Sequence, residues 1–181
     1  FAIWDKREQS LFAARDRFGV KPFYYHFNDS QFIFASEIKA LFAGEIQKVP
    51  NENVWASYFA YGSYGMPNET FWKGIHQLPA GHYLKYKNYG VSIKKWYFFE
   101  KEIEKYQNKE KSFEQVKEKY KKILKDSINI RFRSDVKVGF NISGGVDSST
   151  LLTYVNKTKN KDKINAYTFY TGNEYYDELP W

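Results

Sequence analysis

The stretch SGGVDSS, residues 143–149, combines the residue types needed to bind an anion. Its two glycines let the backbone turn sharply and approach a bulky group with no Cβ in the way. A helix that begins near Asp147 would offer unpaired N–H groups and the positive end of its dipole. Serine hydroxyls add further donors for oxyanions. The pattern therefore indicates an anion site built from Ser143, Gly144, Gly145, Ser148 and Ser149.

Asp147 is the one residue of this stretch that would repel a phosphate. Its carboxylate becomes useful if a divalent cation lies between it and the phosphate oxygens, because Mg²⁺ prefers one or two carboxylates together with phosphate ligands. The alternative is that Ser-Gly-Gly is only a turn and that Asp147 is the N-cap of the next helix. The Walker pattern G-x-x-x-x-G-K followed by Ser or Thr is absent, which excludes an ordinary P-loop.

The segments around the loop predict a βαβ unit. Residues 136–142 alternate apolar and polar side chains as a strand does, STLLTYVN (149–156) reads as a helix, and INAYTFYTG (164–172) reads as a second strand. A strand, crossover helix and second strand imply a parallel sheet. Ligands of such sheets bind beyond the carboxyl ends of the strands, where this loop lies.

The sequence also predicts elements to which we assign no chemical role. Residues 23–27 and 31–36 form a hairpin around an Asn-Asp-Ser turn, residues 37–44 a short helix, and residues 78–86 a turn and a strand. Residues 101–111 are charged and read as a linker, followed by a capping box at Ser112 and Gln115. The helix that starts there carries an apolar stripe expected to pack in the core: Phe113, Val116, Tyr120, Ile123, Leu124 and Ile128.

Composition excludes several classes of protein. The chain of 181 residues contains no cysteine, which rules out a disulfide scaffold, a zinc–thiolate site and a cysteine nucleophile within it, and its three histidines show no ligand spacing. No apolar run approaches the ~20 residues that span a bilayer, and the start FAIWDKRE does not resemble a signal peptide. A soluble, cytoplasmic protein without a membrane partner is the expectation.

The net charge of +7 does not form a nucleic-acid-binding stripe. Residues 1–100 carry 12 basic and 9 acidic side chains, and residues 101–181 carry 16 and 12, so the excess is +3 and +4. The lysine-rich segments alternate with acidic residues, and the aromatic residues that could stack on bases concentrate elsewhere. We expect no nucleic-acid partner; steeply salt-dependent binding would contradict this.

The heptad SGGVDSS resembles the S-G-G-x-D-S loop of ATP pyrophosphatases, which cleave ATP between the α- and β-phosphates. Four further motifs resemble the glutamine-hydrolysing asparagine synthetases, in the same order along the chain. They are ARDRFGVKPFYY (14–25), FIFASEIKAL (32–41), LPAGHYL (78–84) and YDELPW (176–181).

The resemblance implies an α/β and α+β fold in two parts. Residues 1–100 would be the tail of an αββα N-terminal-nucleophile glutaminase domain, 101–111 a linker, and 112–181 the start of a parallel-sheet, adenine-nucleotide α-hydrolase-like synthetase domain. The family makes asparagine from aspartate, glutamine and ATP with Mg²⁺, through β-aspartyl-AMP. A homodimer is compatible with the full-length protein.

The resemblance also assigns roles to residues. Ser143, Gly144, Gly145, Ser148 and Ser149 match the pyrophosphate-binding loop, and Asp147 its magnesium-associated aspartate. Asn141 and Thr171 match positions that contact the adenosine part, although the family usually has apolar residues there. Asp177 and Glu178 match an acidic pair and are left out of the site. No catalytic residue is assigned, because the family's cysteine nucleophile lies upstream of the position matched by Phe1, and this internal fragment is expected to be inactive alone.

The sequence is compatible with two other functions and with two roles for one cluster of charged residues. A related amidotransferase or β-lactam-type synthetase would share these motifs and use another acceptor, and a non-catalytic nucleotide-binding module would share the loop alone. Arg15, Arg17 and Lys21 could form an ion cluster near a glutamine or partner-domain contact. Salt bridges of this cluster with Asp16 and Glu37 are the preferred interpretation.

Overall fold

The computed structural model describes residues 1–106, 112–158, 165–173 and 175–178 of the chain. It is a mixed α/β structure with several sheets, and its contacts separate two compact units, residues 1–108 and 109–181. No helix within the described ranges is both long enough and apolar enough to cross a membrane.

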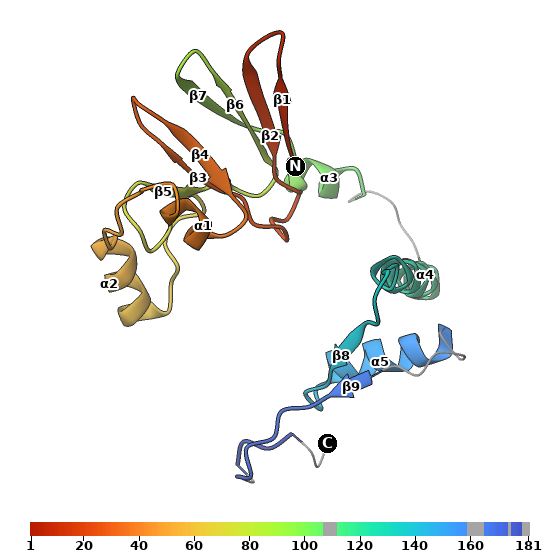
Figure 1. Ribbon diagram of the computed structural model, residues 1–181. Coiled ribbons are helices and arrows are strands. Elements are labelled where there is room, and N and C mark those ends of the chain that lie inside the picture. The colour runs from red at the N-terminus through yellow and green to blue at the C-terminus, as the bar shows by residue number, and fades with distance from the viewer. Residues whose placement is uncertain (107–111, 159–164, 174, 179–181) are drawn as a thin grey trace. The chain divides into compact units, whose positions relative to one another are not determined.

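The first unit contains two antiparallel sheets (Figure 1). The larger has the order β1 (Ala2–Asp5), β2 (Ser10–Ala14), β6 (His82–Lys87), β7 (Gly90–Lys95). The smaller has the order β4 (Phe32–Ala35), β3 (Tyr24–Phe27), β5 (Ile75–Gln77). The predicted hairpin is confirmed, because β3 pairs with β4 around a turn in which Asn28 Oδ1 accepts the N–H groups of Ser30 and Gln31.

An apolar core joins the inner faces of these two sheets. Ala13 and Leu84, opposite each other in the β2–β6 register, are fully buried, and Tyr25 reaches them from β3. The Phe32 and Tyr86 rings stack across the sheets with centroids 4.7 Å apart. Alternation of side chains along each strand places these residues on one face, so the sheets pack as two layers.

Helix α1 (Ile38–Phe42) packs on the other face of the smaller sheet, where Leu41 joins Ile75 in a second core cluster. Helix α2 (Glu52–Tyr61) ends at Gly62 in a left-handed conformation, with φ of 68°. The sequence did not predict α2. The exposed helix α3 (Phe99–Glu104) includes the first residues of the predicted linker 101–111. Residues 107–111 of this linker lie outside the described part.

The prediction that Arg15, Arg17 and Lys21 form salt bridges with Asp16 and Glu37 is wrong. The Arg15 guanidinium instead donates to three backbone carbonyls, those of Lys21, Leu78 and Gly19, at 2.7–2.8 Å. The Asp16 carboxylate accepts backbone N–H groups of the same loop, foremost that of Lys21, and these bonds hold its pKa below the usual value. Glu37 pairs with Lys39. The Arg15 guanidinium and the Asp16 carboxylate therefore fix the loop backbone, since each planar group satisfies several backbone partners at once.

We expect the stability of the first unit to fall as the pH drops from 7 to 5. Burial, with a contribution from the nearby His26, lowers the pKa of His76 from 6.5, so the folded state favours the neutral ring. Protons then bind the unfolded chain more readily below pH ~6.5 and shift the equilibrium toward it. Urea unfolding at several pH values should show this slope. His76→Gln should flatten it, and an unchanged slope in the variant would contradict this assignment.

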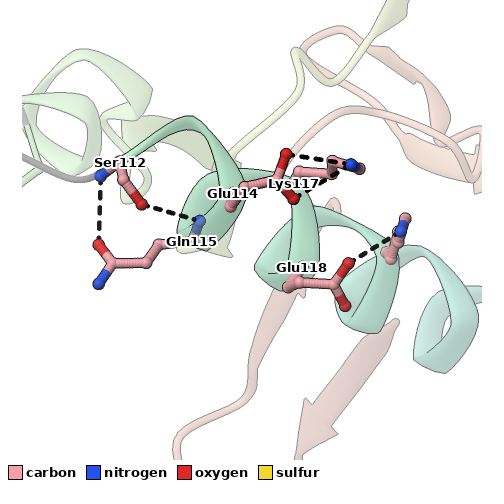
Figure 2. Close-up of polar contacts among 6 residues, drawn as sticks. Ser112, Glu114, Gln115, Lys117 and Glu118 are labelled. Atoms are coloured by element: carbon pink, nitrogen blue, oxygen red, sulfur yellow. Dashed lines mark hydrogen bonds and ion pairs between the residues drawn. The ribbon is translucent and has the colours of Figure 1, made fainter.

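The second unit contains α4 (Phe113–Arg131), β8 (Gly139–Asn141), α5 (Val146–Thr158) and β9 (Asn165–Tyr167). The capping box at the start of α4 is confirmed, as Figure 2 shows. Ser112 Oγ accepts the N–H of Gln115, and Gln115 Oε1 accepts the N–H of Ser112. Ion pairs spaced three residues apart, Glu114–Lys117 and Glu118–Lys121, follow along the exposed side of the first turns.

The apolar stripe of α4 is not buried in a core within the described residues, contrary to the prediction. Ile128 is buried, but the side chains of Phe113, Val116, Tyr120 and Ile123 are 51–77 % exposed. The reason is that, in the described part of the second unit, a two-stranded sheet and α5 offer too little apolar surface to cover a helix of 19 residues.

We expect Ser112→Ala to destabilise the first turn of α4 by about 1 kcal/mol, because it removes the side-chain acceptor of the capping box. Hydrogen exchange should then be faster at the Gln115 amide. The same change at Ser134, outside any helix, is the control. Unchanged protection of Gln115 would contradict the cap.

Candidate nucleotide-binding loop

The predicted βαβ unit is present. Strands β8 and β9 pair in parallel, with Asn141 opposite Tyr167, and the helix α5 connects them. Beyond the ladder the pairing continues for one bond, from Ile142 N–H to the Tyr167 carbonyl at 2.8 Å. The loop after β8 and the segment after β9 therefore leave from adjacent strand ends, where ligands of parallel sheets bind.

Residues 143–145 form a tight turn between β8 and α5. Gly144 has a φ of 68°, in the left-handed region that residues with a Cβ rarely adopt. The hydroxyl of Ser148 accepts the N–H of Ser143 at 3.3 Å and donates to the Gly145 carbonyl at 3.1 Å. Ser148 thus ties both ends of the turn to the helix. Ser143, Gly145 and Ser149 remain exposed.

Asp147 lies in the first turn of α5 and is exposed. Helix α5 begins at Val146, so Asp147 is inside the helix and is not its N-cap. Within the described ranges, no hydrogen bond or ion pair involves its carboxylate. The group is therefore available to a cation beside the N–H donors of the turn, which is the arrangement expected for Mg²⁺ bound with a phosphate.

The described residues contain no group of three or more His, Asp or Glu side chains that could hold a metal ion by themselves. A single carboxylate fits a magnesium ion whose other ligands are phosphate oxygens and waters. Asp147 satisfies this requirement by its exposure and its place next to the turn.

The two residues predicted to contact the nucleoside lie on the two neighbouring strands or just beyond them. Asn141 ends β8, and its side chain is exposed. Thr171 follows β9 by four residues, and its hydroxyl donates to Asp177 Oδ1 at 2.8 Å. Asp177, which was not among the predicted site residues, thus contacts one of them. An acidic residue six positions after Thr171 was the available signal, but only the folded loop shows the pairing.

Comparison with known proteins decides the family. Residues 1–97 match the family profile described as "Glutamine amidotransferase domain", and residues 119–181 match the profile described as "Asparagine synthase". A Methanocaldococcus jannaschii protein, provisionally named a glutamine-hydrolysing asparagine synthetase, is 39% identical over all of this chain. This chain belongs to the glutamine-hydrolysing asparagine synthetase family. The order of the two profiles within 181 residues agrees with the order of the family's motifs.

Two further relatives show how far this asparagine synthetase resemblance extends. Asparagine synthetase 3 of Bacillus subtilis is 36% identical and amidase chyE of Penicillium rubens is 32% identical, each over 83% of this chain. The chain spans 35% of the length of the M. jannaschii relative, 24% of the B. subtilis one and 22% of the amidase.

Proposed function

We propose that the protein carrying this chain makes asparagine from aspartate, glutamine and ATP. The observation that carries the proposal is the loop Ser143–Ser149 at the carboxyl edge of a parallel strand pair, within a stretch that matches the asparagine synthase profile. The reaction needs an activated carboxylate, because a free carboxylate is a poor electrophile. Transfer of AMP to the aspartate side chain supplies a leaving group, and ammonia then displaces AMP.

In this proposal the loop binds the pyrophosphate part of ATP. The first-turn N–H groups of α5, which have no partners four residues earlier in the helix, donate to phosphate oxygens together with Ser143 and Ser149. Gly144 and Gly145 leave room for the close approach, and Ser148 holds the turn in shape. Asp147 would hold Mg²⁺, which neutralises charge on the phosphates when bound. Asn141 and Thr171 would border the nucleoside.

The first unit would contribute to release of ammonia from glutamine, as part of an N-terminal-nucleophile glutaminase domain. Its two packed antiparallel sheets, with α1 on an outer face, suit the αββα arrangement, and its residues match the amidotransferase profile. The second unit would contain the start of an adenine-nucleotide α-hydrolase-like domain, and residues 101–111 would link the two domains. We expect residues 1–181 alone to be inactive, and the intact protein to work in the cytoplasm without nucleic-acid or membrane partners, with a homodimer compatible.

A second candidate function is amide formation on a different acid. The observation that favours it is that the similarity extends to a protein that is not named an asparagine synthetase, since the amidase chyE is 32% identical over 83% of this chain. Both functions use the same loop chemistry and differ in the acceptor.

An assay of the intact protein separates these possibilities. It should be incubated with Mg-ATP, glutamine and aspartate, and AMP, pyrophosphate and asparagine should be followed. We expect AMP and asparagine in equal amounts. AMP formed only with another acid would favour the second candidate, and no AMP with any acid in a panel would reject the adenylation proposal.

A further inference from the structure

The segment that follows β9 closes on itself through a compact set of hydrogen bonds. The Glu178 N–H donates to the Phe169 carbonyl at 3.4 Å, and the N–H groups of Tyr176 and Asp177 donate to the Asn173 carbonyl at 2.9 and 3.0 Å. The chain thus returns to the strand end from which it left. Tyr167 is the last residue of β9, so this closed segment lies at the same edge of the sheet as Ser143–Ser149.

One carboxylate oxygen holds this segment together. Asp177 Oδ1 accepts the Thr171 N–H at 2.6 Å and the Thr171 hydroxyl at 2.8 Å. The Thr171 hydroxyl also accepts the Asn173 N–H at 3.1 Å. Desolvation acts to raise the pKa of Asp177, but the bonds from Thr171, Gly172 and Asn173 outweigh it and lower the pKa, so the group stays ionised at neutral pH.

These bonds change what Thr171 can offer to a ligand. Its hydroxyl proton is directed to Asp177, so the side chain keeps its γ-methyl as the group free for contact. A nucleoside that approaches Thr171 would then meet a fixed backbone and an apolar methyl group. Without the carboxylate, the Thr171 N–H and hydroxyl would lose their acceptor, and the segment would have to be ordered when the ligand binds.

We propose that Asp177 is a positioning residue for the nucleoside end of the ATP site, acting through Thr171. The inference rests on the proposed function, because it takes the ligand of this sheet edge to be ATP. The ATP site would then have two ends with different roles. The turn at Ser143–Ser149 serves the phosphates, and the segment closed by Asp177 serves the nucleoside.

Binding of two ligands to the intact protein tests this separation. Calorimetry should compare Mg-ATP with Mg-pyrophosphate, which lacks the nucleoside. Asp177→Ala should weaken Mg-ATP binding about tenfold, as expected for loss of hydrogen bonds to a charged group, and leave Mg-pyrophosphate unchanged. Thr171→Val, which removes only the hydroxyl, should weaken Mg-ATP about threefold, since the backbone bond remains. Asp177→Asn, which retains an acceptor oxygen, should fall between wild type and Asp177→Ala.

The control is Asp126→Asn, a change of the same charge on the exposed surface of α4, which should bind both ligands as wild type does. Unchanged Mg-ATP affinity in Asp177→Ala would overturn the inference. Equal weakening of both ligands in that variant would also overturn it, because a general loss of structure affects both ends. Wild-type protein that binds neither ligand would instead reject the proposed function.

Discussion

Asp147→Ala should reduce formation of AMP from Mg-ATP by at least about 100-fold, because removal of a metal ligand costs several kcal/mol of stabilisation of developing phosphate charge. The carboxylate is exposed in the first turn of α5 and has no hydrogen bond or ion pair within the described ranges, so its loss should leave the fold intact. The rate should be measured at saturating ATP over a range of Mg²⁺ concentrations.

The matched control is Asp126→Ala, which removes a carboxylate from an exposed position of α4 and leaves the loop unchanged. Circular dichroism of both variants should overlay that of the wild type. A rate within twofold of wild type in Asp147→Ala would mean that the loop aspartate does not hold the cation.

Arg15→Met should lower the free energy of unfolding of the first unit by about 3 kcal/mol, since hydrogen bonds from a charged donor each contribute about 1.5–3 kcal/mol and water can replace some of them. The Leu78 carbonyl, 63 residues away in the chain, and those of Gly19 and Lys21 would all lose their donor. Urea unfolding followed by tryptophan fluorescence reports on this unit, because Trp4, Trp55, Trp72 and Trp96 all lie in it.

Arg15→Lys is the informative companion variant, because an ammonium group cannot reproduce the planar geometry of the guanidinium. It should recover only part of the lost stability. Arg7→Met, at an exposed turn between β1 and β2, is the control and should change stability little. Wild-type stability in Arg15→Met would show that the three carbonyls do not depend on this side chain.

The sequence was sufficient to predict features that depend on local chemistry. The capping box of Ser112 and Gln115, the β3–β4 hairpin and the βαβ unit around the loop all follow from spacing and side-chain type, and the structure confirms them. The placement of Ser143–Ser149 at a strand end also follows from local pattern. Its role in binding ATP remains a prediction.

Features that depend on distant partners were missed or misread. Helix α2 shows little helical periodicity in the sequence, and its aromatic residues instead contact one another and Phe71, as Trp55 does with tilted rings whose centroids are 4.5 Å apart. Arg15 was expected to pair with a carboxylate, but folding brings the Leu78 carbonyl within 2.7 Å of it. Asp177 has a partner only because the chain turns back after β9. For α2 and Arg15 the deciding partner is far away in the sequence, and for Asp177 it is only six positions away but is brought close by the folded loop.

The most direct test of the proposed chemistry follows an oxygen atom from aspartate to AMP. Adenylation joins a side-chain carboxylate oxygen to the α-phosphorus and releases pyrophosphate, and attack by ammonia then breaks the bond between that oxygen and the acyl carbon. The intact protein should be given aspartate labelled with ¹⁸O in the side-chain carboxylate, together with Mg-ATP and glutamine. We predict asparagine and AMP in equal amounts, with one labelled oxygen in each AMP. Asparagine formed with unlabelled AMP, or with ADP and labelled inorganic phosphate, would contradict an adenylate intermediate.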